Sequence, residues 1–318
     1  MTGCCSLSPP RGGGPGGGPA AIQLGFAAEP IIDLADADAT TLYSECLALL
    51  RVANSAMFSS SDFVGGLEAR GDIGLLDAAI VDLVLDALAS SPYRSLGCNV
   101  SPKTLADAGA WRALFDRIAQ RAWLAGRLTL EITETYPINE IPGAAQRLME
   151  AKRLGCRLAI DDFGAGLDTS VHLQGVDVDW DIVKLDRRCL GDLRKTPSGR
   201  YGLRSFVALA TCLAPVVVVE GIETHDHLLA ALAAGAQYGQ GWLFVGAVHD
   251  RWTVPDVMIR DALVALLAER PGQNSGLLQP PTCPEAISED ERMLSARTDR
   301  IGNRVRTLVA RAWAGGAR

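Results

Sequence analysis

The chain contains no uninterrupted apolar run of the roughly 18 residues that a membrane-spanning helix needs. Its amino terminus has no charged segment followed by an apolar one, so a secretory signal peptide is not expected. Lys and Arg are outnumbered by Asp and Glu, 30 to 37, which argues against a general nucleic-acid binder, because such proteins are normally basic. These absences predict a cytoplasmic protein with no transmembrane segment and no affinity for DNA.

No CxxC pair occurs among the eight cysteines, although zinc and redox sites typically use that spacing. Several cysteines lie inside apolar segments: Cys46, Cys98, Cys156 and Cys212. Buried thiols in a reducing compartment explain this pattern better than disulfides or structural zinc. His225 and His227 are two residues apart on a predicted helix and face different directions, so helix capping or solvent contact is favoured over a zinc site.

The two ends of the chain differ in composition from the middle. Residues 1–20 are rich in Gly and Pro and are predicted to form a disordered leader. Residues 21–270 are predicted to form one compact domain, followed by a Pro- and Gly-rich linker over 271–287 and an amphipathic helical tail over 288–318. We expect the tail to pack on its own domain or on a second subunit. The alternative is docking to a protein partner or a membrane surface.

Strand and helix patterns alternate in the compact domain, as in successive βα units. The strand patterns are continuous in Val, Ile and Leu, which is typical of parallel strands buried on both faces. The helical patterns cover residues 74–89, 105–120, 142–154, 200–213 and 226–234. A TIM-type barrel takes about 250 residues, so the length of 318 fits one α/β barrel.

Polar side chains stand at the ends of these apolar stretches. They are Asn99, Glu131, Asp161, Asp162, Lys184 and Glu220. The carboxyl ends of barrel strands open into one shared mouth, so we expect these side chains to meet there. Several carboxylates in one place repel one another unless cations neutralise them, and oxygen ligands favour Mg²⁺ or Mn²⁺. The sequence therefore predicts a metal-dependent site on an α/β barrel.

The ordered set of motifs resembles the EAL family of cyclic di-GMP phosphodiesterases. The motifs, spread over residues 22–250, are EPIIDL, SECLAL, FVGGLEARGDIGLLD, CNVSP, LEITET, LGCRLAIDDFGAG, DIVKLD, VVVVEGIET and GQGWLF. The resemblance implies a TIM-like (β/α)8 barrel with an antiparallel first strand. It also implies hydrolysis of cyclic di-GMP to linear pGpG with two Mg²⁺ or Mn²⁺ ions, and a homodimer.

The resemblance further implies roles for individual residues. The first metal is matched by Glu45, Asn99, Glu131 and Asp161, and the second by Asp161, Asp162 and Glu220. The catalytic residues are matched by Lys184, Asp186 and Glu220. Lys184 is suited to orient water or to stabilise negative charge, whereas Glu220 or a neighbouring carboxylate could accept the proton. The residues expected to support the site loop are Glu134, Glu223, Gly164 and Gly166, and those expected on the substrate side are Leu47, Gln240 and Trp242. Trp242 could stack on a guanine or pack at the barrel rim.

The motif around Glu45 departs from the family pattern. The family usually has E-x-L-x-R, and here Leu49 stands in the place of the Arg. A second register recovers Arg51 but puts Leu47 where the metal-binding Glu belongs. The first register, which we prefer, keeps the metals and loses an Arg contact to phosphate, at a cost of about 1.5–3 kcal/mol. The second register loses a metal ligand.

Other departures lie on the substrate side. Glu29 occupies the position of a usual Gln, Ala247 replaces a usual Pro, and the loop over 166–169 lacks the common aromatic and serine pair. Each is expected to weaken affinity or loop closure without abolishing the site. An active phosphodiesterase is therefore the preferred function, and a catalytically silent cyclic di-GMP receptor or an interaction scaffold is the alternative.

Overall fold

The computed structural model describes residues 22–36, 40–52, 56–133, 136–165, 177–191, 197–244 and 248–269. The predicted leader, linker and tail lie outside these residues. The strands are β1 (Ile22–Asp33), β2 (Thr41–Val52), β3 (Ala56–Ser59), β4 (Leu96–Val100), β5 (Leu128–Thr133), β6 (Arg157–Phe163), β7 (Ile182–Leu185), β8 (Val216–Val219), β9 (Tyr238–Gly239) and β10 (Val248–Thr253). The helices are α1 (Ser60–Arg70), α2 (Ile73–Ser90), α3 (Pro102–Ala106), α4 (Ala108–Ala119), η1 (Ala122–Arg127), η2 (Ile138–Glu140), α5 (Ala144–Leu154), α7 (Arg188–Gly191), α8 (Pro197–Ala210), α9 (His225–Ala234) and α10 (Val257–Ala268).

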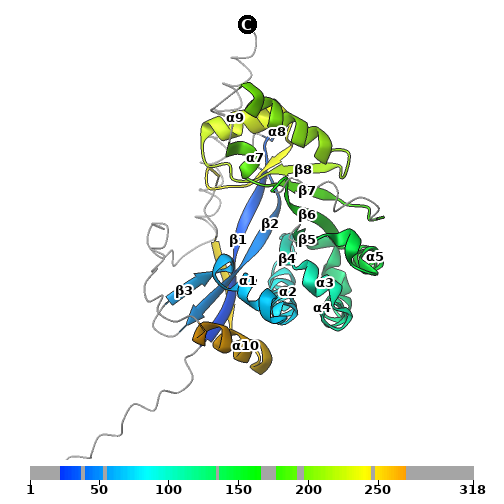
Figure 1. Cartoon of the computed structure of the whole chain (residues 1–318), viewed down its shortest axis with the longest axis vertical. Coiled ribbons are helices and arrows are strands. Elements are labelled where there is room, and N and C mark those ends of the chain that lie inside the picture. Colours follow the sequence, from blue (N-terminus) through cyan, green and yellow to red (C-terminus); the bar gives the residue numbers. More distant parts are fainter. Residues whose placement is uncertain are drawn as a thin grey trace, which may run out of the picture.

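Eight of the strands close into a barrel, in the order β1, β2, β4, β5, β6, β7, β8, β9 and back to β1 (Figure 1). Strand β1 pairs antiparallel with both of its barrel neighbours, β2 and β9. The other neighbouring pairs, from β2–β4 to β8–β9, are parallel. The predicted TIM-like barrel with an antiparallel first strand is therefore confirmed.

The first two strands extend beyond the barrel. Each has 12 residues, and the part of β1 and β2 that leaves the barrel pairs with β10 and β3 (Figure 1). Helices α1 and α10 contact each other beside this extension. There the ring of Trp252 lies opposite Gly25, and the guanidinium of Arg51 stacks 4.0 Å from the centre of that ring. This stacking holds Arg51 in the extension, six positions along β2 from Glu45.

Apolar side chains form two separate cores. The larger core lies between the barrel and its helices. The smaller one, which we call the barrel floor, consists of Ile31, Tyr43, Ala159, Ile182 and Val218. Side chains on a strand alternate between faces, so a residue two positions from a floor residue also faces the barrel interior. This periodicity sets the positions of the site residues described below.

One predicted helix is divided in the structure. The segment 105–120, expected to be one helix, is divided between α3 and α4 at Asp107. The Asp107 carboxylate accepts hydrogen bonds from the amides of Gly109 and Ala110, and such N-cap bonds start a new helix. The prediction of a single helix is therefore wrong. Among the described residues, no helix is long and apolar enough to cross a membrane.

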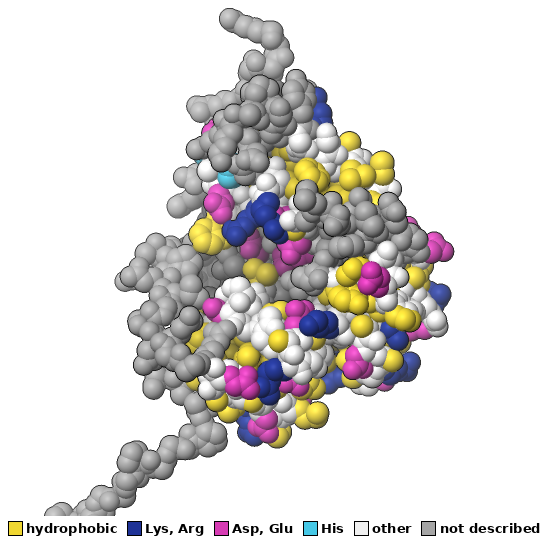
Figure 2. Space-filling model, in the orientation of Figure 1, with side chains coloured by type: hydrophobic (Ala, Val, Ile, Leu, Met, Phe, Trp, Pro, Cys, Tyr) yellow, Lys and Arg dark blue, Asp and Glu magenta, His cyan; other side chains and the backbone are white. Residues whose placement is uncertain are grey.

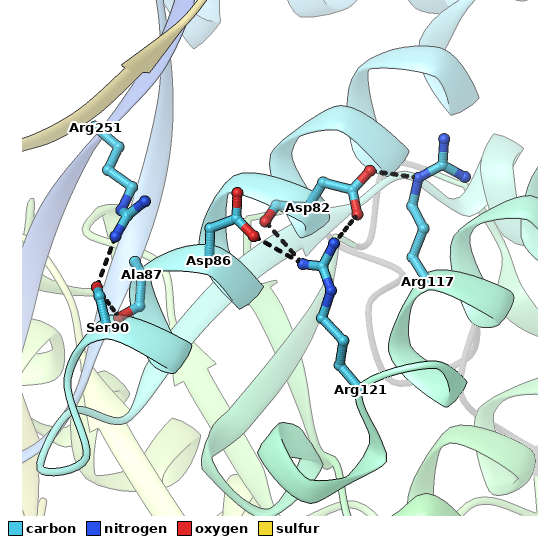
Figure 3. Close-up of polar contacts among 7 residues, drawn as sticks. All are labelled: Asp82, Asp86, Ala87, Ser90, Arg117, Arg121 and Arg251. Atoms are coloured by element: carbon cyan, nitrogen blue, oxygen red, sulfur yellow. Dashed lines mark hydrogen bonds and ion pairs between the residues drawn. The ribbon is translucent and has the colours of Figure 1, made fainter.

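The outer side of α2 carries an ion-pair network (Figure 3). Asp82 lies 2.7 Å from Nε of Arg117 and 3.3 Å from Nη2 of Arg121, and Arg121 also lies 3.0 Å from Asp86. Arg251 of β10 donates to Ser90 at the end of the same helix. These contacts tie α2 to α4 and β10. Figure 2 shows acidic, basic and apolar side chains interspersed over one face of the molecule.

We expect Arg121→Ala to lower the free energy of unfolding by about 1 kcal/mol, because it removes two ion pairs of one network while their partly exposed setting screens each pair. Arg112→Ala is the matched control, since Arg112 forms a single exposed pair with Asp116; the expected loss there is below about 0.5 kcal/mol. Urea unfolding of both variants measures the difference. Equal losses would contradict a networked role for Arg121.

Candidate metal-binding site

Lys184 lies at the centre of the barrel, with four carboxylates around its ammonium group. Its Nζ lies 2.6 Å from Glu131 Oε2, 2.7 Å from Glu220 Oε1, and 2.8 Å from both Glu45 Oε2 and Asp161 Oδ1. Glu45, Asp161 and Lys184 each lie two positions beyond a floor residue of the same strand. Glu220, which directly follows β8, lies two positions beyond the floor residue Val218. The Lys184 side chain has no exposed surface. We call these five residues the Lys184 cluster.

Glu45 is held at both carboxylate oxygens. Oε1 accepts from the amide of Asn99 at 2.7 Å, and Oε2 accepts from Lys184 and from the amide of Gln240, each at 2.8 Å. Leu47, two residues further along β2, is partly buried. The structure thus brings Glu45, and not Leu47, together with the other predicted ligands, which is the arrangement that the preferred register requires.

Fully ionised, the four carboxyl groups of the cluster would hold more negative charge than one lysine can balance. Burial, together with the neighbouring charge of Glu45 or Asp161, raises the pKa of Glu131 and of Glu220 well above the usual range. Burial also opposes ionisation of Glu45, but Lys184 and the two amides lower its pKa overall. Burial disfavours a charged Lys184, yet the surrounding carboxylates raise the pKa of the ammonium. A further cation would therefore be attracted to this cluster.

The donor atoms fit a hard divalent cation. One oxygen each from Glu45, Glu131 and Asp161 lies within 4.8 Å of the others. Within the described part of the chain, Asn99 Oδ1 and Glu131 Oε1 are buried without a hydrogen-bond partner. Glu131 Oε2 and Asp161 Oδ1 contact Lys184 at ion-pair distance but outside hydrogen-bond geometry. One ammonium has three N–H donors, which is fewer than the four carboxylates around it. Buried oxygen atoms without a hydrogen-bond partner are suitable ligands for Mg²⁺ or Mn²⁺.

A second acidic group lies next to the cluster. Asp162 adopts a left-handed backbone conformation with φ of 59°, and burial together with Asp161 and Asp186 raises its pKa to about 7. Asp186 accepts hydrogen bonds from the backbone amide and the guanidinium of Arg188, each at 2.7 Å. Although burial opposes ionisation of Asp186, these bonds lower its pKa. The structure thus places Asp186 against Asp162 and Arg188 rather than against Lys184.

One acidic residue at this level was not among the predicted ligands. Glu29 lies directly opposite Glu45 in the β1–β2 ladder, and only 9% of its surface is exposed. Burial and the charge of Glu45 raise the pKa of Glu29 to about 7, against the effects of Lys184 and Gln240. In the sequence, Glu29 is a departure from the family pattern on the substrate side. The β1–β2 register, which the motif alone does not reveal, brings it into the site.

The remaining predicted residues lie around the mouth. Trp242 is 68% exposed, and Leu49 is buried. Gly164 has φ of 88° and packs so closely on Cys189 and Phe206 that a side chain there would collide with them. Glu223 is exposed, and its amide lies 3.4 Å from Nδ1 of His227. Other predicted positions, namely Glu134, Gly166 and Ala247, lie outside the described residues.

The two histidines are not brought together as a zinc site. His227 Nδ1 lies 3.2 Å from the carbonyl oxygen of Gly221, and its backbone amide donates to Thr224 at the start of α9. His225 is exposed at the first position of the same helix. The His225 side chain is therefore in contact with solvent, and His227 takes part in the capping contacts at the start of α9.

The turn after Asn99 is anchored by a buried carboxyl group. Asp77 of α2 accepts hydrogen bonds from the amide of Ser101 at 2.9 Å and from the hydroxyl of Thr104 at 2.6 Å. Burial raises its pKa to about 7 despite these bonds. An unfolded aspartate titrates near ~4. Between these values the folded chain keeps a proton that the unfolded chain has lost, so this group makes the fold less stable as pH rises from about 4 to about 7.

We expect Asp77→Asn to remove this pH dependence, because the amide keeps an oxygen acceptor and does not ionise. The free energy of unfolding of the variant relative to the unaltered chain should therefore increase between pH 5 and pH 7, by up to about 1.4 kcal/mol per pH unit. Urea unfolding at several pH values measures this difference. A difference that stays constant over the range would contradict a buried, protonated Asp77.

The comparisons with known proteins agree with this architecture. The model of the EAL domain family matches residues 20–247. The uncharacterized protein y4lL of Sinorhizobium fredii is 31% identical over 225 residues, 70% of this chain and 27% of that protein. The cyclic di-GMP phosphodiesterase NbdA of Pseudomonas aeruginosa is 28% identical over 227 residues, 70% of this chain and 28% of that protein. The chain therefore spans little more than a quarter of the length of these relatives.

A solved structure has the same fold. The EAL domain of FimX from Pseudomonas aeruginosa, bound to c-di-GMP, superposes with a TM-score of 0.62 at 21% identity. The superposition covers 71% of this chain and 90% of that domain. At 21% identity, this match shows that the two proteins share a fold.

Proposed function

Because this chain belongs to the EAL domain family, we propose that it is a metal-dependent phosphodiesterase that hydrolyses cyclic di-GMP to linear pGpG. The observation that carries the proposal is the Lys184 cluster, in which one buried ammonium faces four carboxylates beside the unpartnered oxygen of Asn99. Such an excess of buried oxygen atoms, which can act as metal ligands, suits divalent cations and the phosphate groups that these cations bind. The relative NbdA, named as a cyclic di-GMP phosphodiesterase, supports the choice of substrate.

The residues divide between two proposed Mg²⁺ or Mn²⁺ positions. Glu45, Asn99, Glu131 and Asp161 would hold one cation, and Asp161, Asp162 and Glu220 the other. When bound, such cations offset charge on phosphoryl oxygens and acidify water. Glu220 is the most exposed carboxylate of the Lys184 cluster, at 17% of its side chain, so we assign it the role of accepting a proton from the attacking water. Lys184 offsets the repulsion among the carboxylates and stabilises negative charge that develops on the phosphate.

A second candidate function is a cyclic di-GMP receptor or scaffold without catalysis. It is favoured by Leu49, a buried apolar residue at the position where the family has a phosphate-contacting Arg. The proposals of a homodimer, a cytoplasmic location and a protein partner for residues 288–318 remain predictions from the sequence.

Chromatography of cyclic di-GMP incubated with the purified full chain and Mn²⁺ tests the proposal. We expect pGpG from the unaltered chain and no detectable product from Glu45→Gln, which keeps the side-chain volume and removes the charge. Glu140→Gln, at an exposed position of η2, is the control and should retain full turnover.

Product formation by Glu45→Gln at the rate of the control would overturn the assignment of Glu45. No product from any variant, combined with saturable binding of cyclic di-GMP, would support the receptor function instead. Absence of both product and binding would overturn both candidate functions.

A further inference from the structure

Helix α10 turns apolar side chains toward solvent as well as toward the protein. It contacts α1 and α2, and the buried residues of its inner side are Ile259, Ala262, Leu263 and Leu266. On the opposite side of the helix, Val257 is 60% exposed, Met258 67% and Val264 43%. Val254, which precedes the helix, is 70% exposed. We call these four exposed residues the α10 stripe.

The α10 stripe follows the period of a helix. Spacings of three, four and seven residues place its members on one side of α10. Asp261 lies among them, and its carboxylate pairs at 3.2 Å with the neighbouring Arg260 in an exposed position. A helix at the surface normally turns a polar side to water, and a contiguous exposed apolar patch marks a contact site. The composition of α10 therefore fits a helix that is covered on both sides.

The segment 288–318 has a complementary pattern in its sequence. Its predicted helix carries an apolar face formed by Ile301, Val305, Leu308 and Val309. Residues 297–311 contain five arginines and one acidic residue, whereas residues 256–269 contain three acidic residues and one arginine. Opposite net charges beside two apolar surfaces favour their association and oppose association of either surface with itself.

The same segment is tethered to α10. The helix ends at Ala268, and residues 271–287 separate it from the predicted tail helix. A flexible linker of that length spans about 20 Å or more, and a helix of 12 residues such as α10 is about 18 Å long. The linker therefore allows the segment to fold back along α10. It also holds the segment near the stripe at a high effective concentration.

A second copy of the chain fits the α10 stripe less well. A specific dimer buries about 800 Å² of surface on each partner, and one stripe along a helix of about 18 Å offers much less. A tethered segment does not need that area, because the linker has already brought the two surfaces together.

We propose that residues 288–318 fold back as an amphipathic helix and dock on the α10 stripe of their own chain, with their arginines beside the acidic residues of α10. The docked segment would complete the apolar packing around α10. This inference is independent of the proposed function, because the Lys184 cluster contains no residue of α10 or of the segment.

Hydrogen exchange of the full chain, followed by mass spectrometry, tests the docking. We expect the amides of residues 297–311 to exchange about 10-fold or more slowly in the unaltered chain than in Met258→Lys, since that change removes one apolar contact and adds a charge that repels arginine. Leu229→Lys is the matched control, because Leu229 is 42% exposed on α9 and its replacement should leave the protection unchanged. Equal exchange in the unaltered chain and Met258→Lys would overturn the proposal.

Oxidation of Met258 by hydrogen peroxide gives a second test, in which α10 keeps its own sequence. A docked segment covers the thioether of Met258 and slows its conversion to the sulfoxide. We expect several-fold faster oxidation of Met258 in Leu308→Gln than in the unaltered chain, and no change in Arg306→Gln, because Arg306 lies outside the apolar face of the predicted helix. Equal oxidation of Met258 in the unaltered chain and Leu308→Gln would overturn docking on α10.

The dependence on protein concentration separates the possible occupants of the α10 stripe. Docking within one chain predicts the same protection of residues 297–311 at low and high concentration. Protection that rises with concentration, together with a dimer in sedimentation, would show that a second copy supplies the contact and would overturn the proposal. These measurements do not involve turnover or cation binding, so their outcome is separate from that of the proposed function.

Discussion

Lys184→Met is expected to lower the free energy of unfolding by about 3–5 kcal/mol in the absence of divalent cations, because it leaves buried carboxylates without their counter-charge. The ammonium is the shared partner of Glu45, Glu131, Asp161 and Glu220. The methionine keeps most of the side-chain volume, so the loss reports the charge rather than a cavity. Urea unfolding with and without Mn²⁺ measures it, and Mn²⁺ should restore part of the lost stability.

The matched control for this prediction is Lys152→Met. Lys152 also pairs with two carboxylates, Asp179 and Asp181, but its side chain is 20% exposed. Its loss should stay near or below about 1 kcal/mol and should not respond to Mn²⁺. If Lys184→Met unfolds at the same urea concentration as the unaltered chain, the carboxylates are protonated together in the fold, and the Lys184 cluster is not held by an ion pair.

The sequence was sufficient to predict the barrel and most members of its central cluster. Apolar strands followed by polar residues indicate which side chains share the mouth. The parallel register places Asn99 opposite Glu131, whereas Asp161 lies opposite Thr133, two positions further along β5. The motif alone could not decide between Glu45 and Leu47, because both alignments of the E-x-L-x-R motif are compatible with a strand. The pairing of β2 with β4, which sets Glu45 opposite Gly97, brings Glu45 to the level of Lys184.

Three features were beyond a pattern of apolar and polar residues. The break at Asp107 depends on side-chain bonds to two amides, which compete with the continuous helix that the apolar spacing favours. The bonds that Arg188 donates to Asp186, two residues away, depend on a local side-chain arrangement. Glu29 enters the site through an antiparallel pairing of β1 with β2, and such long-range registers are not encoded in any one motif.

Gly97→Ala is expected to disrupt the site and the fold together. A Cβ atom at position 97 would overlap Oε1 of Glu131 and the ring of Tyr43. Neither neighbour has room to move, since both side chains are buried, Tyr43 in the barrel floor and Glu131 beside Lys184. Overpacking of this kind costs about 1–3 kcal/mol, and displacement of Glu131 should weaken Mn²⁺ binding by about 10-fold or more. Urea unfolding and calorimetric titration with Mn²⁺ measure the two effects.

Gly65→Ala provides the control, because it adds the same atom at a helical position of α1 with no other atom within 4 Å. That change should raise stability by about 0.5–1 kcal/mol and leave Mn²⁺ affinity unchanged. Steric crowding therefore requires glycine at position 97 but not at position 65. In β4 the missing side chain makes space for a carboxylate of the neighbouring strand, so the cluster requires a small residue as strictly as it requires acidic ones. Retention of both stability and Mn²⁺ affinity in Gly97→Ala would show that the Glu131 carboxylate lies elsewhere in the cation-bound protein.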